Sequence, residues 1–148
     1  MKAICVLHQN KYKGYILFTE LKNYTKIEVK LSGLPPGKRG FHIHEKGNLM
    51  DGCKTLCAHY NPFNTNHGGL NKKDSHVGDL GNLEVDTNGN VDCILKAKKV
   101  RLSGEHSVIG RSIVIHDKED DLGKGGNEDS LKTGNAGSRI ACGIIGYF

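Results

Sequence analysis

The chain has no tryptophan, only three prolines and an aromatic content of 6% in 148 residues. No apolar run approaches the roughly 20 residues that a membrane-spanning helix needs, and helical periodicity is hard to find. The lysines are scattered, without a basic block or interleaved aromatic side chains. A basic β-barrel that binds nucleic acid would need a stacking platform that the sequence lacks. We therefore expect no nucleic acid and no membrane as partners.

The N-terminal segment, Met1 to His8, alternates into polar residues too soon to form the apolar centre of a signal peptide. We expect a cytoplasmic location from this feature. The formal net charge of +5 fits solvated surface lysines. A more specific interpretation of the charge is the attraction of a small anionic substrate.

The composition favours an all-β fold. Glycine is abundant, at 20 residues, and strand-like segments recur at about ten-residue spacing, as in antiparallel sandwiches and barrels. The expected strands are Lys2–His8, Tyr15–Glu20, Tyr24–Ser32, Gly40–Glu45, Gly81–Asp86, Asn90–Lys96, Ser112–His116 and Ile140–Gly146. With a hairpin turn at Asp86–Asn90, eight such strands predict a closed or nearly closed β-barrel.

Two long segments interrupt the strands, from Lys46 to Asp79 and from Asp117 to Arg139. Loops of this length inside a compact domain are usually functional or disordered. Both are rich in glycine, asparagine and aspartate, but the first also holds several candidate metal ligands, which favours a function. No repeat or linker composition indicates a second domain, so we expect one domain over residues 1–148.

Two histidines alternate on one expected strand. His42 and His44 are two residues apart, so both side chains point to the same face and can share one ion. His116 ends a later strand and is free to join them. Imidazole is the commonest protein ligand for zinc and copper. The pattern therefore predicts a metal site with several imidazole ligands.

The first long loop supplies a second candidate set of ligands. His59, His67 and His76 provide three imidazoles and Asp79 a carboxylate, which is a complete set for zinc. Together with the strand histidines, these residues exceed what one four-coordinate ion can use. Either some of them are idle, or two ions lie side by side. His59 can serve both ions, because each of its ring nitrogens can bind a metal if the ring loses its proton.

Three longer motifs extend this pattern over nearly the whole chain. They are Gly40–Glu45, His76–Asn82, and the stretch that runs from Asp120–Asn127 to Thr133–Arg139. Their residues and their order closely resemble the copper-zinc superoxide dismutases. The resemblance implies an eight-stranded antiparallel Greek-key β-barrel, related to the immunoglobulin-like sandwich, with two long functional loops folded over a paired metal site.

The resemblance also implies one copper ion and one zinc ion per subunit. The implied copper ligands are His42, His44, His59 and His116, and the implied zinc ligands are His59, His67, His76 and Asp79. His59 would be a bridging imidazolate with a catalytic role. Asp120 corresponds to a carboxylate outside the ligand sets that links His42 to His67 and so orients both rings.

Further residues match the substrate channel of the family. Arg139 matches a guanidinium beside copper, whose fixed fork of donors can dock a small anion. Thr133 would form part of the channel wall and help exclude larger anions. Lys132, Glu128 and Asp129 match a charged loop that shapes the electric field at the channel mouth.

The implied reaction converts two superoxide anions and two protons to dioxygen and hydrogen peroxide, with copper alternately reduced and reoxidised. The implied biological role is protection against oxidative stress. Zinc does no redox work, because its d shell is filled, and would hold His59 while that ring carries a proton. The alternative of a different class is a metal carrier with a dismutase-like domain. Such carriers typically lose copper ligands or the arginine, which this chain retains.

The cysteines and the C-terminus complete the expectations. The resemblance implies a disulfide between Cys53 and Cys142, which is uncommon in the cytosol. Cys57 matches no family cysteine, so a pairing of Cys57 with Cys142 stays open. The apolar segment 143–148 favours a homodimer, with a copper chaperone as a candidate further partner. Lys46 stands where an apolar residue commonly helps form the dimer contact, and a charge there costs desolvation unless it is paired or at the rim.

Overall fold

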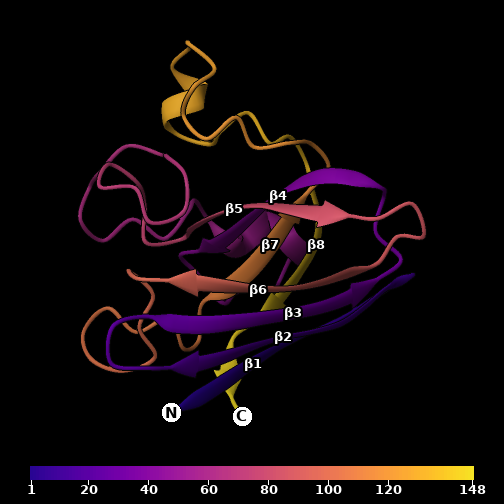
Figure 1. Ribbon diagram of the computed structural model, residues 1–148, viewed down its shortest axis with the longest axis horizontal. Helices are drawn as coiled ribbons and strands as arrows, with labels where there is room; N and C mark the ends of the chain where they lie inside the picture. The colour runs from indigo at the N-terminus through magenta and orange to yellow at the C-terminus, as the bar shows by residue number, and fades with distance from the viewer.

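The computed structural model describes residues 1–148 as nine antiparallel strands in two sheets (Figure 1). The strands are β1 (Lys2–Gln9), β2 (Tyr12–Glu20), β3 (Thr25–Ser32), β4 (Gly37–His44), β5 (Asp79–Val85), β6 (Val91–Ala97), β7 (Ser112–His116), β8 (Arg139–Ile144) and β9 (Gly146–Tyr147). One sheet has the order β6-β3-β2-β1-β9 and the other β5-β4-β7-β8. The expectation of an all-β fold is therefore confirmed.

The core lies between the two sheets. The first sheet leaves its outer face more exposed, whereas all five residues of β7 in the second sheet are buried. In β3, for example, Ile27, Val29 and Leu31 are buried, while the residues between them are more exposed. This alternation is what an antiparallel sheet with one solvated face requires. Most buried apolar side chains form one cluster of 25 residues that draws on both sheets, and Leu56, Val114 and Cys142 form a small second cluster. The sequence therefore encodes the sandwich mainly through period-two burial.

The segment Asp86–Asn90 does not form the predicted hairpin. It has good turn chemistry, since the Asp86 carboxylate accepts hydrogen bonds from the backbone N–H groups of Asn88 and Asn90 at 2.9 and 2.8 Å. However, β5 and β6, which it joins, belong to different sheets. The turn signal is local, whereas the partner of each strand is decided by which faces are buried. The prediction of a β-hairpin here is wrong.

Most strand predictions differ from the structure by a few residues at their ends. β7 has the predicted bounds, whereas β2 and β4 begin at Tyr12 and Gly37, ahead of the predicted Tyr15 and Gly40. Glycine weakens a strand signal, yet Gly14 pairs in register with Leu7 of β1 within the ladder. The predicted strand Ile140–Gly146 is divided in the structure into β8 and the two-residue β9, which pairs with β1. The 3-10 turns η1 (Gly52–Leu56) and η2 (Asp129–Leu131) were not predicted.

The first long loop is attached to β4 by backbone hydrogen bonds. Tyr60 N–H donates to Ile43 O, and Ile43 N–H donates to Gly78 O, each at 2.8 Å. A side chain at Gly78 would collide with the carbonyl oxygen of Ile43, so only glycine permits this approach. The second loop carries η2 and lies at the top of Figure 1, beyond the sheets. The two loops flank the end of β4 that carries His42 and His44.

A disulfide joins the first loop to β8. Cys53 and Cys142 are bonded across a sequence separation of 89 residues, so the pairing implied by the family resemblance is confirmed. Cys57 is free and exposed and does not pair with Cys142. Cys5 is buried in the core, as expected of a small apolar side chain, while Cys93 is half-buried.

The helical segments are the short turns η1 and η2, and no helix in the structure has the length and apolarity needed to cross a membrane.

We predict that Cys142→Ser lowers the free energy of unfolding by about 4 kcal/mol, because the disulfide restricts a long loop in the unfolded chain. Urea titrations of the metal-loaded protein, followed by circular dichroism, measure this difference. Cys57→Ser is the matched control and leaves the midpoint nearly unchanged, since Cys57 is exposed and unpaired. An unchanged midpoint in Cys142→Ser would contradict a stabilising role for the bond.

Candidate metal centre

Four buried histidines converge at the end of the second sheet. His42 and His44 come from β4, His116 from the end of β7, and His59 from the first long loop. One ring nitrogen from each lies within 4.8 Å of those of the other three. The rings of His42 and His59 are stacked, with centroids 3.9 Å apart. Residues that are 74 positions apart at most are thus brought to one point.

The strands are irregular where these histidines lie. The register between β4 and β5 shifts between Gly40 and His42, and the register between β7 and β8 shifts between Ile115 and His116. Such bulges re-aim side chains next to functional sites. An isolated β-bridge also pairs His44 with His59 and so brings the loop histidine alongside the strand.

For His44 and His116, backbone carbonyls determine which ring nitrogen carries the proton. His44 Nδ1 lies 2.8 Å from Cys57 O, and His116 Nδ1 lies 3.1 Å from Gly137 O. A carbonyl oxygen only accepts, so each Nδ1 must donate its hydrogen. Nε2 of each ring is then a bare lone pair that faces the other histidines. This is the arrangement that second partners impose on metal-binding imidazoles.

The facing nitrogens have no hydrogen-bond partner. The unpaired buried side-chain atoms of the chain are His42 Nδ1, His44 Nε2, His59 Nε2 and His116 Nε2. Leaving a buried polar atom unpaired costs about 1–3 kcal/mol each, so four such atoms at one point require an explanation. A cation coordinated by imidazoles satisfies all four at once, and this donor set fits copper.

Burial keeps these rings neutral, which is the form that binds a metal. Burial lowers the pKa of His42 well below its ordinary value, with further lowering by nearby His59 and His116. The pKa of His44 is lowered strongly for the same main reason. Burial also lowers the pKa of His116, to about 4, although its hydrogen bond to Gly137 opposes the shift.

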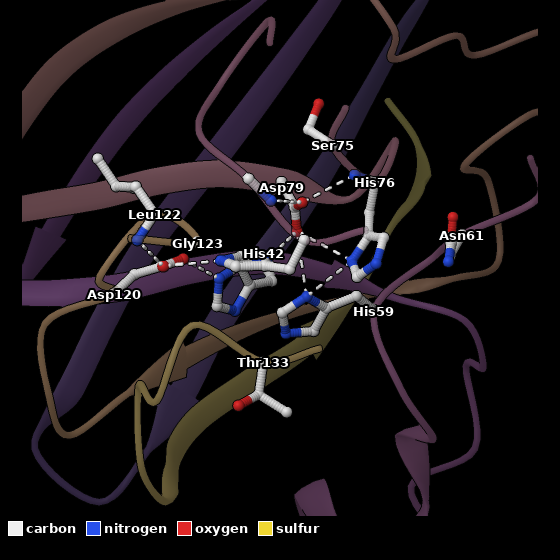
Figure 2. Close-up of polar contacts among 12 residues, drawn as sticks. His42, His59, Asn61, Ser75, His76, Asp79, Asp120, Leu122, Gly123 and Thr133 are labelled. Carbon is white, nitrogen blue, oxygen red and sulfur yellow. Dashed lines mark hydrogen bonds and ion pairs between the residues drawn. The ribbon is translucent and has the colours of Figure 1, made fainter. Parts of the chain in front are cut away.

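A second donor set lies on the other side of His59. Nδ1 of His59 is 3.2 Å from Nδ1 of His76 and 3.1 Å from Oδ1 of Asp79. The same carboxylate oxygen lies 2.8 Å from His67 Nδ1 and 3.3 Å from His76 Nδ1. A tetrahedron of ligands about 2.0 Å from zinc has edges of about 3.3 Å. The four distances of 3.2, 3.1, 2.8 and 3.3 Å are close to such edges. Figure 2 shows Asp79 beside His76 and His59.

His42 also lies within 4.8 Å of His59, His67 and Asp79 and so competes with His76 for the fourth position. Two contacts favour His76 at that position. The Nε2 atom of His42 is already bonded to Asp120 Oδ2 at 2.6 Å. His76 Nδ1, in contrast, lies close to both His59 Nδ1 and Asp79 Oδ1.

The carboxylate of Asp79 is fixed by backbone donors. Its Oδ2 accepts hydrogen bonds from the N–H groups of His76 and Gly68, at 2.8 and 3.0 Å, which leaves Oδ1 facing the imidazoles. Burial alone would raise the pKa of Asp79, but hydrogen bonds from His59, His67 and His76 hold it well below its usual range. Burial alone would lower the pKa of His67, but hydrogen bonds to Asp120 and Asp79 raise it to about 9. The pocket therefore holds an anionic carboxylate among imidazoles.

Asp120 connects the two donor sets. Its Oδ2 accepts from His42 Nε2 at 2.6 Å and its Oδ1 accepts from His67 Nε2 at 2.7 Å, all of them buried. Figure 2 shows this carboxylate beside His42. Gly134 lies against both Asp120 and His67, and a side chain there would collide with them. The second long loop is thus attached directly to both sets of rings.

A cavity of about 880 Å³ opens beside the histidines. Arg139, Thr133 and Lys132 line it, together with His44, His59, His76 and His116. Glu128 and Asp129 do not line it: Glu128 pairs with Lys132 at 2.7 Å, and the Asp129 backbone carbonyl accepts from Thr133 Oγ1 at 3.0 Å. The charged loop therefore supports the cavity wall, with its acids outside the lining.

The position of Arg139 is set by the disulfide loop. Its two terminal nitrogens, Nη1 and Nη2, donate to Cys53 O at 2.9 Å and to Cys57 O at 2.6 Å. Burial lowers its pKa from the ordinary arginine value, but a guanidinium stays charged. The arrangement places a fixed cation in the wall of the cavity.

Several lining residues were not predicted from the sequence. They include Lys118, Asn135, Ala136 and the loop segment Asn64–Asn66. Lys118 gave no periodic signal, because β7 ends at His116 and residues 117 and 118 form a bend. The sequence also gave no sign of a role for Arg111. Its guanidinium lies 3.8 Å from the ring centre of Tyr60, the residue that follows His59 in the chain. The two residues are too far apart in sequence for a local pattern to reveal this contact.

Comparisons with known proteins agree with this geometry. The family described as copper/zinc superoxide dismutase matches residues 12–145. The chain is 51% identical over 148 residues to "Superoxide dismutase [Cu-Zn]" of Paramecium bursaria Chlorella virus 1, covering 99% of this chain and 79% of that one. It is 50% identical to an extracellular copper-zinc superoxide dismutase of Drosophila melanogaster, covering 90% and 75% of the two chains.

Two further comparisons extend over both chains. "Superoxide dismutase [Cu-Zn] A" of Xenopus laevis is 46% identical, covering 99% of this chain and 98% of its own. A solved structure described as the clock protein EA4 superposes with a TM-score of 0.96 at 45% identity, covering 99% and 94% of the two chains. The chain belongs to the copper/zinc superoxide dismutase family.

Proposed function

We propose that this chain catalyses the dismutation of superoxide, converting two superoxide anions and two protons to dioxygen and hydrogen peroxide. The observation that carries the proposal is the pair of buried donor sets on the two nitrogens of His59, beside a cavity that Arg139 lines. Relatives over nearly the whole chain are copper-zinc superoxide dismutases. The biological role that follows is protection against oxidative stress.

Copper is assigned to His42, His44, His59 and His116, and zinc to His59, His67, His76 and Asp79. The support for copper is the four unpaired nitrogens, and the support for zinc is the spacing of the four donor atoms. When bound, copper supplies one-electron redox chemistry, whereas zinc, with a filled d shell, supplies none. His59 presents Nε2 to one set and Nδ1 to the other, so its ring would help to hold both ions.

Arg139 binds the substrate anion. Two of its five N–H donors are used by the carbonyls of Cys53 and Cys57, which hold the guanidinium in place. The remaining donors are available to an anion in the cavity. Because the side chain is already ordered, docking superoxide costs little further side-chain entropy.

His59 delivers a proton to the second superoxide anion. Its Nε2 atom faces the cavity-side donor set, and the ring also lines the cavity. The opposite nitrogen, Nδ1, stays anchored near Asp79 and His76, so the ring holds its orientation while Nε2 gains and loses a proton. Water in the cavity supplies the other proton.

The cavity rim attracts the anion and limits its size. Lys118 and Lys132 line the cavity beside Arg139, and Thr133 lies in the same wall. Lys132 and Glu128, the exposed ion pair on either side of η2, shape the field at the mouth together with Asp129, the first residue of η2. Fields of this kind accelerate the encounter with small anions and are screened by salt; the handling of superoxide by this enzyme family is a known example.

We also propose that the chain forms a homodimer through an apolar patch around the first loop. Leu49 and Met50 are 44% and 90% exposed, and Gly47 lies against Gly110 and Ile144. Lys46 does not oppose this contact, since its side chain is 56% exposed and its amino group lies 3.5 Å from the Glu45 carboxylate. A closed interface with two-fold symmetry would bury such a patch against its own copy.

Other expectations stay proposals. The chain is proposed to be one domain over residues 1–148, and its two sheets to form the eight-stranded Greek-key barrel that the family resemblance implies, because β1 approaches β8 and β5 approaches β6 at the sheet edges. A copper chaperone as loading partner and a cytoplasmic location also stay predictions, while relatives include proteins named extracellular.

The proposed activity predicts rapid superoxide decay by the copper- and zinc-loaded protein, measured after pulsed generation of superoxide. Raising the salt concentration from about 0.01 M to 1 M shortens the screening length from about 30 Å to 3 Å, so the rate falls. No decay at full metal occupancy would replace the proposal with a metal carrier.

Arg139→Gln is predicted to lower the rate about 100-fold, because a preorganised charged donor is lost, while metal analysis still finds both ions bound. Arg139→Lys is the matched control, because it keeps the positive charge but loses the planar guanidinium with its paired N–H donors. Its rate should lie between that of the unchanged protein and that of Arg139→Gln. If Arg139→Gln also lost copper, the arginine would be a structural support of the metal site and not a docking residue.

Asp120→Asn is predicted to weaken metal binding about 10- to 100-fold, because an amide cannot accept hydrogen bonds from both His42 and His67. Titration of the metal-free protein against a competing chelator measures this loss. Asp92→Asn, an exposed change on β6, provides the control and leaves both affinities unaltered. Native affinity in Asp120→Asn would show that the carboxylate does not support the rings.

A further inference from the structure

Gln9, the last residue of β1, contacts the disulfide. Its Oε1 accepts a hydrogen bond from the backbone N–H of Cys142 at 2.8 Å. Its Nε2 lies 3.5 Å from Cys142 Sγ and 4.0 Å from Cys53 Sγ. The side chain therefore lies against the bond that ties the first long loop to β8, and it comes from the opposite sheet.

The orientation of the Gln9 amide follows from its partners. The backbone N–H of Cys142 can only donate, so the amide oxygen must face it. The NH₂ group is then directed at the two sulfurs, where a weak acceptor is available. Of the two contacts, the one to Cys142 Sγ is shorter by half an ångström, so the donor acts mainly on that sulfur.

The two cysteines differ in exposure. Cys142 is 2% exposed, within a small buried cluster, whereas Cys53 is half-buried at the start of η1. A thiolate that reduces the bond must reach one sulfur from the side opposite the other. Access therefore favours attack at Cys53, which makes Cys142 the sulfur that leaves.

We propose that Gln9 is a positioning residue that directs the reduction of this disulfide toward release of the Cys142 thiolate. A reducing thiolate attacks Cys53 Sγ and forms a mixed disulfide there. The bond to Cys142 breaks, and its electron pair moves to Cys142 Sγ, which accepts a hydrogen bond from Gln9 Nε2 and later takes a proton from water. A second thiolate then attacks the mixed disulfide and leaves Cys53 reduced.

The rate of such an exchange depends on the leaving thiol, because a leaving group of lower pKa departs faster. An N–H donor beside Cys142 stabilises its thiolate and so favours departure. Reduction would also free the Cys53 segment, whose carbonyl holds Arg139 at 2.9 Å. Gln9 thus connects the redox state of the loop to a residue of the cavity wall.

The first test locates the mixed disulfide. The metal-loaded chain carrying Cys57→Ser, which removes the exposed free thiol, is treated with 2-mercaptoethanol, quenched with acid and mapped by mass spectrometry. An adduct on Cys53 with Cys142 as the free thiol is expected. An adduct mainly on Cys142 would overturn the proposal.

The second test removes the donor. Gln9→Glu, in the same background, keeps an acceptor for the Cys142 N–H but places a carboxylate at the sulfurs. The leaving Cys142 thiolate then has no N–H donor from residue 9. Reduction by 2-mercaptoethanol should therefore be at least about threefold slower than in the Cys57→Ser background. In the fully reduced protein, the pH profile for alkylation of Cys142 should move up by about one unit.

His8→Glu is the matched control. It adds the same charge one residue earlier in β1, where the side chain points to the other face of the strand and is exposed. Its reduction rate and its alkylation profile should equal those of the Cys57→Ser background. If Gln9→Glu also equals that background, or if both carboxylate variants slow equally, Gln9 does not direct the reduction.

Discussion

The structure depends on keeping imidazole lone pairs buried and free of protein partners. Four such nitrogens face one another at the end of the second sheet, and no other buried side-chain polar atom lacks a partner. Their burial is costly until a cation binds them, so the surrounding backbone must hold the rings in place. Strand bulges beside His42 and His116, and a glycine at position 78 that lets the loop meet β4, serve this requirement. The free energy of metal binding is therefore coupled to the free energy of folding in this chain.

Two connections make the long loops part of the same centre. Asp120 of the second loop holds a ring from each donor set, at 2.6 and 2.7 Å. The disulfide holds the first loop against β8, and the loop carbonyls in turn hold Arg139. A change in either loop is thus transmitted to the cavity through fixed contacts. This explains how segments with so little regular structure can position chemistry: their order comes from ligands, carboxylates and one covalent bond.

The sequence predicted what rests on short-range periodicity and on residue type. The alternation of apolar and polar residues indicated the strands, and the two-residue spacing of His42 and His44 indicated a metal-binding face. Contacts between segments that are far apart in the chain could not be predicted from such local patterns. Nothing local shows that Asp86–Asn90 joins two sheets, because its turn chemistry is the same in a hairpin. Gln9 gave no signal either, since its contact with Cys142 spans 133 residues. The ligand assignments drew on family resemblance, because residue types alone left one or two ions open.

We propose above that one imidazole, that of His59, is shared by two metal ions. Crystals of the copper- and zinc-loaded protein, with diffraction recorded at the absorption edges of the two metals, test it most directly. We expect copper at His59 Nε2 among His42, His44 and His116, and zinc at His59 Nδ1 beside Asp79. A single ion, or two ions of which only one contacts His59, would contradict it.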